Sequence, residues 1–327
     1  MQLSRRTALG SLLAAPVVLT AGRGIAADDM STPASPPTGQ VPGIYRYALG
    51  DITVTSILDG YGAGPADMVI GYEDAAARAA HDAAHHPFVP GQVTTPVNAF
   101  ILETPQHLVA IDTGMPGFAG QTYGAFQRLL AAAGYRPEDF DALLMTHLHT
   151  DHVGGLLDAD GAPAFANAEL VVAAEEWAFT HDDAVFASLP EQFQQYFALS
   201  RNMVAPYAGR RREFSGEAEV LPGIAALPLP GHTPGHTGFV LSSGGRQLLI
   251  WGDVVHVPAV QFSEPGWAVV YDADVATAVA TRQRLLDQLS TDGIEVAGMH
   301  LDFPAIGFVD RTPSAYRWVQ SPWQYSG

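Results

Sequence analysis

The 327-residue sequence contains no cysteine and no lysine, because all 16 of its basic residues are arginine. Without cysteine there is no disulfide framework, no thiolate zinc or iron–sulfur site and no thiol nucleophile. Without lysine there is no Schiff-base chemistry and no Walker-type phosphate lysine. These absences exclude several classes of covalent catalyst and of metal site.

Positive charge is also scarce, since 34 acidic residues oppose 16 basic ones and the formal net charge is -18. Nucleic acids and anionic lipid surfaces are bound by clustered positive charge, so neither is expected as a partner. The hydrophobic fraction of 47% and the charged fraction of 15% are typical of a compact globular protein. The length allows one large domain or two small ones.

The first 27 residues are predicted to be a cleaved export signal. Arg5 and Arg6 precede a short apolar run at residues 9–21, and small residues follow as far as Ala27. This order describes a secretory signal, and the paired arginines favour the twin-arginine route, which carries folded proteins. We expect cleavage after Ala26 or Ala27, a flexible lead-in over residues 28–43, and a periplasmic or secreted protein with no membrane association after cleavage.

Strand and helix patterns alternate through residues 44–327. Apolar or alternating segments predict strands at 44–48, 52–58, 98–102, 107–111, 141–145, 170–173, 224–229, 238–241, 247–251 and 296–299. Helical spacing predicts helices at 121–133, ending at Gly134, at 182–207 with a break at Pro190, and at 274–289. Strands, then a helix, then strands again, occurring twice, suggest two packed sheets with helices outside.

A histidine cluster follows the strand predicted at 141–145. His147, His149, Asp151 and His152 occupy four of six consecutive positions, and two glycines come after them. Imidazole and carboxylate are the usual nitrogen and oxygen ligands of a borderline ion such as zinc. Four such groups in one loop after a rigid strand predict a metal site rather than a solvated polar loop.

This His-x-His-x-Asp-His pattern resembles the signature of the metallo-β-lactamase superfamily, and further stretches match that family's motifs in order. They are Asp112-Thr113-Gly114, the stretch from Pro230 to Thr237, Trp251-Gly252-Asp253 and Gly298-Met299-His300. The resemblance covers nearly all of the chain after the predicted signal. It implies an α/β (α+β) protein, a single-domain αββα sandwich over residues 44–327, with metals at one edge of the two sheets.

The resemblance also implies the ligands. One divalent ion would be held by His147, His149 and His232, the other by Asp151, His152 and His300, and Asp253 would bridge them. Zinc is the favoured ion, while manganese, cobalt and iron suit the same ligand set. Asp112 and His236 would orient the ligands from behind.

Two divalent ions facing only two ligand carboxylates leave a positive field, which lowers the pKa of a bridging water and yields a hydroxide nucleophile. The resemblance gives catalytic roles to Asp253, Asp151 and His256. His256 lies three positions after Asp253, where lactonase-type relatives carry a polar residue that faces the substrate carbonyl. A hydrogen-bonded structural histidine is the alternative for His256.

Within the superfamily, the chain resembles exported methyl parathion hydrolases and their lactonase and arylesterase relatives more closely, in stretches that include residues 146–155, 231–237 and 300–307. This predicts a metal-dependent hydrolase that opens lactones or cleaves aryl esters of small neutral hydrophobic substrates, with phosphotriester hydrolysis as a side activity. Expected pocket walls are Phe118, Trp177, Phe193, Tyr196, Trp267 and Tyr271, together with His256. A phosphotriesterase proper and a non-catalytic periplasmic metal-binding protein stay open as alternatives. The group often forms homodimers, and a homodimer is open here as well.

Overall fold

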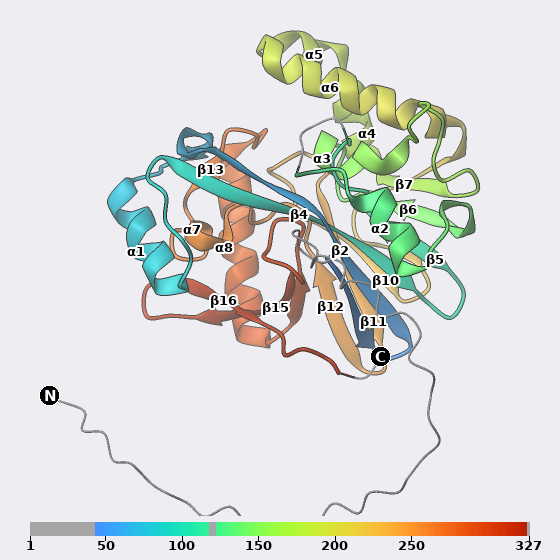
Figure 1. The fold of residues 1–327 in the computed structure, drawn as a ribbon. Coiled ribbons are helices and arrows are strands. Elements are labelled where there is room, and N and C mark those ends of the chain that lie inside the picture. Colours follow the sequence, from blue (N-terminus) through green and yellow to red (C-terminus); the bar gives the residue numbers. More distant parts are fainter. Residues whose placement is uncertain (1–42, 118–121, 326–327) are drawn as a thin grey trace, which may run out of the picture. The chain divides into compact units, whose positions relative to one another are not determined.

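Two seven-stranded β-sheets face each other and hold the main hydrophobic core between them (Figure 1). The computed structural model describes residues 43–117 and 122–325. The predicted export signal, nearly all of the predicted lead-in and Phe118 lie outside these residues. Pro42–Gly327 form one compact unit.

The first sheet has the strand order β1-β2-β4-β5-β6-β7-β8. Its first three strand pairs, as far as β4–β5, are antiparallel, and its last three, from β5–β6 on, are parallel. The strands are β1 (Ile44–Leu49), β2 (Ile52–Pro65), β4 (Gln92–Glu103), β5 (Leu108–Ile111), β6 (Ala142–Leu144), β7 (Glu169–Ala173) and β8 (Arg211–Phe214).

The second sheet has the order β16-β15-β14-β12-β11-β10-β9, and only the β12–β14 pair is parallel. Its strands are β9 (Ala218–Leu221), β10 (Ile224–Pro228), β11 (Thr237–Ser243), β12 (Arg246–Ile250), β14 (Glu295–Ala297), β15 (Ile306–Arg311) and β16 (Tyr316–Gln320). A separate two-stranded ribbon joins β3 (Val69–Ile70) to β13 (Ala268–Val269).

The helices are α1 (Asp74–Ala84), α2 (Phe126–Ala133), α3 (Thr150–Val153), α4 (Ala174–His181), α5 (Asp183–Ser188), α6 (Glu191–Val204), α7 (Pro258–Gln261) and α8 (Val275–Asp292). α2 and α6 pack on the outer face of the first sheet, and α8 packs beside β15 of the second. The layers are therefore helix, sheet, sheet, helix, which confirms the predicted αββα sandwich. Among residues 43–117 and 122–325, no helix combines the length and apolarity that a bilayer crossing needs.

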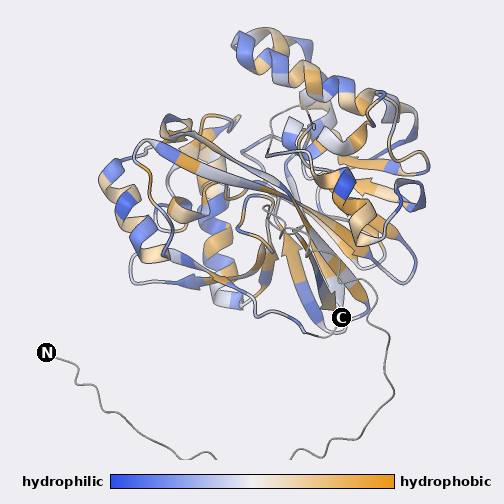
Figure 2. Ribbon diagram, viewed as in Figure 1, coloured by the Kyte–Doolittle hydropathy of each residue, from blue (hydrophilic) through white to orange (hydrophobic). Residues whose placement is uncertain are grey.

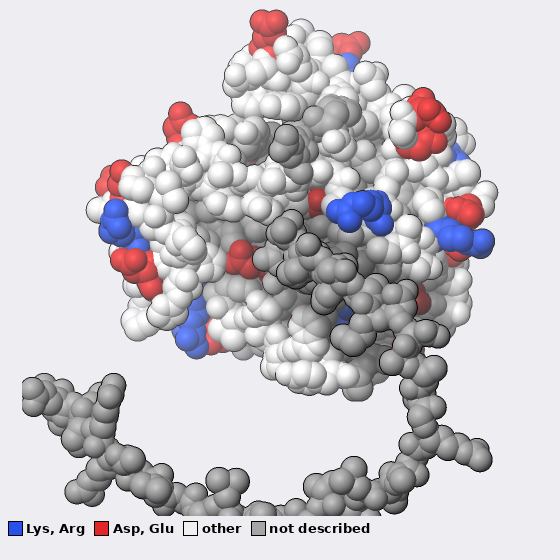
Figure 3. All heavy atoms as spheres, viewed as in Figure 1, with Lys and Arg blue, Asp and Glu red and all other residues white. Residues whose placement is uncertain are grey.

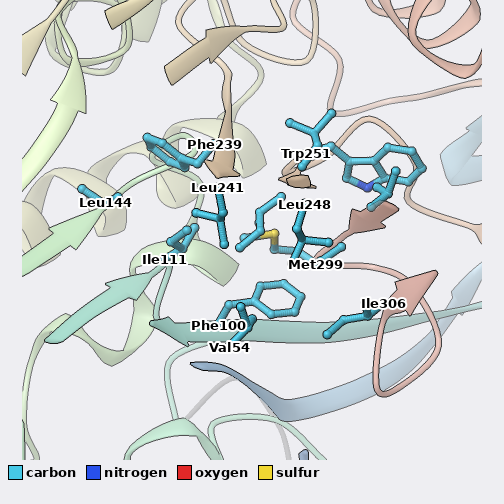
Figure 4. Close-up of a cluster of buried hydrophobic side chains, with 14 of the residues drawn as sticks. Val54, Phe100, Ile111, Leu144, Phe239, Leu241, Leu248, Trp251, Met299 and Ile306 are labelled. Carbon is cyan, nitrogen blue, oxygen red and sulfur yellow. The ribbon is translucent and has the colours of Figure 1, made fainter. Parts of the chain in front are cut away.

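Strand β4 shows how the sequence produces these layers. Phe100 and Leu102 face the core between the sheets, whereas Ala99 and Ile101 face the helical layer, because successive side chains of a strand alternate. Phe100 belongs to the same core as Phe239 and Leu248 of the second sheet (Figure 4). Hydrophobic residues accordingly predominate along the strands, while many polar residues lie on the helices (Figure 2). Burial of each large apolar side chain stabilises the fold by about 1.5–3 kcal/mol.

The predicted helix at 121–133 begins later than expected, at Phe126. Gly124 has a φ of 76°, a left-handed conformation that interrupts a helix. The Asp59 carboxylate accepts hydrogen bonds from the backbone N–H groups of Gly124 and Phe126, at 3.1 and 2.8 Å, and fixes this turn. The predicted end is confirmed, since Gly134 caps α2 in the left-handed region with a φ of 91°.

The break predicted at Pro190 is confirmed, because it separates α5 from α6. The helix predicted at 274–289 is α8, with the Asp274 side chain accepting a hydrogen bond from the backbone N–H of Thr277 at its start. Helices α1 and α4, the edge strands β8, β9 and β16, and β15 next to β16 were not predicted from the sequence. Most of these elements are half-exposed or alanine-rich, so their hydrophobic pattern is weak.

Candidate metal centre

The predicted ligands follow the C-terminal ends of four strands. The loop after β6 carries His147, His149, Asp151 and His152, while His232, Asp253 and His300 follow β10, β12 and β14 respectively. These strand ends meet at one edge of the sandwich, where side chains from far apart in the sequence converge. All seven predicted ligands are brought together there.

His147, His149 and His232 form the first cluster, with one ring nitrogen of each within 4.8 Å of the others. Nε2 of His232 lies 2.9 Å from Nδ1 of His149. The His147 ring stands edge-on to those of His149 and His232, with centroids 4.6 and 4.8 Å away. Three imidazoles aimed at one point are a ligand set suited to a zinc-like ion.

Asp151, His152, Asp253 and His300 form the second cluster. Oδ2 of Asp151 lies 3.6 Å from Nε2 of His152 and 3.5 Å from Nε2 of His300. Two imidazoles and two carboxylates give a mixed nitrogen and oxygen set, which divalent first-row metals accept.

Asp253 stands between the two clusters. Its Oδ2 is 3.4 Å from Nε2 of His232 and 3.1 Å from Nε2 of His300, and its Oδ1 is 3.2 Å from Nε2 of His152. A carboxylate in this position can give one oxygen to each of two ions. The geometry is that of a bridging ligand.

Unpartnered buried atoms test whether this arrangement suits metal ions. Nε2 of His147, Nε2 of His152 and Oδ1 of Asp253 are buried and have no hydrogen-bond partner among the described residues. An unsatisfied buried polar atom costs about 1–3 kcal/mol, so such a group of them requires a compensating interaction. These atoms belong to histidine and aspartate, which are residue types that ligate divalent ions. The site therefore suits two divalent ions.

The far sides of the ligand rings are held by the protein. Nδ1 of His232 lies 2.8 Å from Oδ1 of Asp272, and Nδ1 of His300 lies 2.7 Å from the carbonyl oxygen of Pro96. A ring that donates its Nδ1 proton presents the lone pair of Nε2 to the site. The sequence analysis missed Asp272, because no motif marks it and only the fold places it beside His232.

Asp112 and His236 occupy the positions predicted for orienting residues. Asp112 has a φ of 56°, and its carboxylate accepts hydrogen bonds from the Thr146 hydroxyl at 2.7 Å and backbone N–H at 2.9 Å, while lying 2.6 Å from Nδ1 of His152. His236 accepts a hydrogen bond at Nε2 from the backbone N–H of Asp253, 2.8 Å away. A second buried acid, Glu176, accepts from the backbone N–H of Leu148. Glu176 was also missed by the sequence analysis.

The charge balance of the site attracts cations. Burial holds the pKa of His149 at about 3 and that of His147 well below its ordinary value, so both rings are neutral, as metal binding requires. Burial also lowers the pKa of His152, but Asp253, Asp151 and Asp112 overcome this effect and raise it well above its ordinary value. The carboxylate side of the site therefore favours a positive charge, either a proton or a metal ion.

The profile of the Metallo-beta-lactamase superfamily matches residues 93–291 of the sequence, which is more than half of the chain. The chain belongs to the metallo-beta-lactamase superfamily. A crystal structure of the hydrolase AbOPH of the beta lactamase superfamily is similar over 88% of this chain and 100% of that one, with 31% identity and a TM-score of 0.82.

Two further relatives are named as lactonases. An N-acyl homoserine lactonase of Bacillus sp. is 28% identical over 183 residues, which is 50% of this chain and 65% of that protein. The chain thus matches slightly less than two thirds of the length of this lactonase. The structure of AidC, a dizinc quorum-quenching lactonase, has a TM-score of 0.79 over 86% of this chain and 99% of that one, at 23% identity, and this likeness supports the fold.

A cavity of about 550 Å³ opens beside the two ligand clusters. Asp151, Asp253, His232 and His300 form its floor. Its walls come from the glycine-rich end of β2, from α4 and α6, and from the segment after β13. The predicted pocket residues Phe193, Tyr196, Tyr271 and His256 line it.

The prediction that Trp177 and Trp267 form pocket walls is wrong. Trp177 stacks on His181 with ring centroids 4.0 Å apart and lies under the Arg211 guanidinium at 3.9 Å, outside the cavity. Trp267 packs against Tyr72, 5.6 Å away, in a separate small core beneath the β3–β13 ribbon. Each aromatic ring buries itself against its own neighbours, which the sequence does not identify.

His256 is placed on the cavity side of the ligands. Its Nε2 lies 3.2 Å from Oδ2 of Asp253, and its ring stacks on His300 with centroids 5.2 Å apart. Both ring nitrogens are buried without a hydrogen-bond partner in the described part of the chain, and burial lowers the pKa of His256 to about 4. His256 is therefore a buried ring at the centre whose Nε2 faces the Asp253 carboxylate and whose Nδ1 has no partner in the described part of the chain.

Proposed function

We propose that this protein is a dinuclear metal hydrolase that opens lactones or cleaves aryl esters, with phosphotriester hydrolysis as a side activity. The observation that carries the proposal is the bridging position of Asp253 between two ligand clusters at the floor of an apolar cavity. The relatives named as lactonases support a lactone as the substrate.

Two divalent ions, which we propose to be zinc, would supply a nucleophile from water and polarise the oxygen of the electrophile. The residues around them have separable tasks. His147, His149 and His232 would hold one ion, Asp151, His152 and His300 would hold the other, and Asp253 lies where it could contribute to both. His256, as a neutral imidazole, can donate a hydrogen bond to the carbonyl oxygen on which negative charge develops.

The cavity favours a neutral substrate. Among residues 43–117 and 122–325, no arginine lines it, and the charged side chains that do are aspartates. On the face seen in Figure 3, acidic and basic side chains lie scattered between uncharged areas, and no continuous basic area is visible. An anionic substrate would find no positive side chain in this cavity. A lactone, an ester or a triester carries no such charge.

Hydrolysis of phosphotriesters as the main activity is the second candidate, favoured by the size and apolar lining of the cavity. We rank it lower because His256 lies beside Asp253 and the bulky Tyr271 also lines the cavity, which suits a planar carbonyl better than a tetrahedral phosphorus with three substituents.

The test is to measure kcat/KM of the zinc-replete protein for dihydrocoumarin, an N-acyl homoserine lactone and methyl paraoxon. We expect the two carbonyl substrates to be preferred. Asp253→Ala should abolish turnover and lower the bound zinc, whereas Asp160→Ala, at an exposed aspartate that does not line the cavity, should change neither. Full activity of Asp253→Ala would overturn the hydrolase proposal, and a tenfold preference for paraoxon would reverse the order of the two candidates.

A further inference from the structure

Glu176, in the first turn of α4, is a buried acid that belongs to neither ligand cluster and does not line the cavity. Burying a carboxyl group is costly unless its oxygens are hydrogen-bonded, so its partners show what holds it there. Both oxygens have partners, and these partners lie in two different ligand-bearing loops.

One oxygen of Glu176 holds the loop after β6. Oε1 accepts a hydrogen bond from the backbone N–H of Leu148 at 2.9 Å. Leu148 stands between the predicted ligands His147 and His149. The bond therefore fixes the stretch of backbone from which both of these rings extend.

The other oxygen of Glu176 holds the loop after β10. Oε2 accepts a hydrogen bond from the hydroxyl of Thr233, which is completely buried and directly follows the predicted ligand His232. The bond therefore restrains the backbone next to the third ring of the first cluster.

Gly235 brings the same loop into direct contact with α4. A Cβ atom placed on Gly235 would lie 2.1 Å from the backbone nitrogen of Glu176 and 2.5 Å from its Cα, so a side chain at this position would collide with the helix. This close approach is independent of the hydrogen bond to Thr233. Two separate features thus seat the His232 loop on the first turn of α4.

The two loops that Glu176 joins come from different sheets, since β6 belongs to the first sheet and β10 to the second. At this junction Nε2 of His232 lies 2.9 Å from Nδ1 of His149. The second cluster is supported elsewhere: Asp112 lies beside Nδ1 of His152, and the Pro96 carbonyl oxygen lies beside Nδ1 of His300.

We propose that Glu176 is a positioning residue for the first ion: through Leu148 and Thr233 it sets the spacing of the three histidines of the first cluster. The second ion does not depend on it. The inference rests on the two-ion centre of the proposed function. It adds that separate parts of the chain support the two ion sites.

The test is to measure how Glu176→Met divides limiting zinc between the two clusters. Titration against a competing chelator gives the two affinities, and anomalous X-ray scattering from crystals soaked with limiting zinc assigns them to the clusters. The variant removes both acceptor oxygens, so affinity at the first cluster should fall about 10- to 100-fold, and at the second less than about threefold. Glu175→Met, at the exposed acid next in sequence, should change neither affinity.

Thr233→Val keeps the shape of its side chain and removes only one of the contacts, so it decides the question if Glu176→Met does not fold. It should lower zinc affinity at the first cluster about three- to tenfold relative to the second. An equal loss at both clusters would show a merely structural role and overturn the inference, as would unchanged affinity at the first.

These measurements do not depend on turnover. A protein that binds zinc at both clusters but hydrolyses neither lactones, esters nor phosphotriesters would contradict the proposed hydrolase alone. The selective loss of zinc from the first cluster would still support the role of Glu176, and its absence would still overturn it.

Discussion

Oδ2 of Asp112 lies 2.6 Å from Nδ1 of His152, and both side chains are completely buried. This contact fixes the orientation of the ring and strengthens Nε2 as a ligand. Asp112→Asn keeps the size of the side chain but removes its charge, so we expect metal affinity at the second cluster to fall about 10- to 100-fold. Zinc titration with a competing chelator measures this loss.

Excess zinc should restore most of the activity of Asp112→Asn, because the ligands themselves are intact. Asp141→Asn, at an exposed aspartate beside His107, is the matched control and should bind zinc normally. Unchanged zinc affinity in Asp112→Asn would contradict the orienting role.

Metal affinity should rise with pH through the neutral range. The pKa values of His152 and His300 are raised by the surrounding carboxylates, although burial lowers them, so both rings bind a proton that a metal ion must displace. For each proton displaced, the affinity increases about tenfold per pH unit below the raised pKa. Competition with a zinc-binding dye between about pH 6 and pH 8 measures the slope. A zinc affinity independent of pH would contradict the displacement of protons from His152 and His300. The surface variant His107→Gln should keep the pH dependence of the unaltered protein.

Variants of Phe193 and Trp177 distinguish an aromatic residue that lines the cavity from one that only stabilises the fold. Phe193 lies edge-to-face with Tyr271, with centroids 5.9 Å apart, at the cavity wall. Phe193→Ala removes apolar contact area from a bound aryl group, so KM for an aryl ester should rise about three- to tenfold with little change in kcat.

Trp177→Ala serves as the comparison, because Trp177 stacks on His181 outside the cavity. We expect it to lower the melting temperature by a few degrees and to leave KM unchanged. A rise in KM for Trp177→Ala equal to that for Phe193→Ala would show that both rings contact the substrate.

Arg282 of α8 connects the loops that follow β12. The buried guanidinium donates hydrogen bonds to the carbonyl oxygens of Val254 and Trp267, at 2.6 and 2.5 Å, and to that of Pro265 at 3.2 Å. Arg282→Met leaves these carbonyls unpaired and should lower the free energy of unfolding by about 3 kcal/mol or more. Urea denaturation measures the change. The exposed neighbour Arg284→Met should cost less than about 0.5 kcal/mol, and equal effects of the two variants would contradict the role of Arg282.

Much of the fold could be predicted from local patterns. The strand at 141–145, the Pro190 break and the Gly134 cap depend on residues adjacent in the chain, so a short window contains the physical cause. The start of α2 could not be predicted, because Asp59, which holds that turn, is more than sixty residues away. Edge strand β16 lacks the apolar pattern of the central strands because its residues are half-buried or exposed.

The ligand set could be predicted because, like the central strands, it is encoded by residues that are close together in the sequence. His147, His149, Asp151 and His152 are close in sequence, and the motifs around His232, Asp253 and His300 are specific to the family. The supporting residues Asp272 and Glu176, and the cavity residue Tyr123, belong to no motif. Their positions depend on strand ends and turns that only the packed sheets bring together.

The sequence by itself determined that this chain has the residues of a two-ion centre and the layers of an αββα sandwich, because ligand chemistry and strand alternation are local properties. Only the tertiary structure decided which aromatic rings face the cavity, and it excluded Trp177 and Trp267 from it. An aromatic ring buries equally well against any apolar neighbour. Which neighbour it finds is set by the packing of distant elements, as it is for the Tyr123 hydroxyl over Gly62.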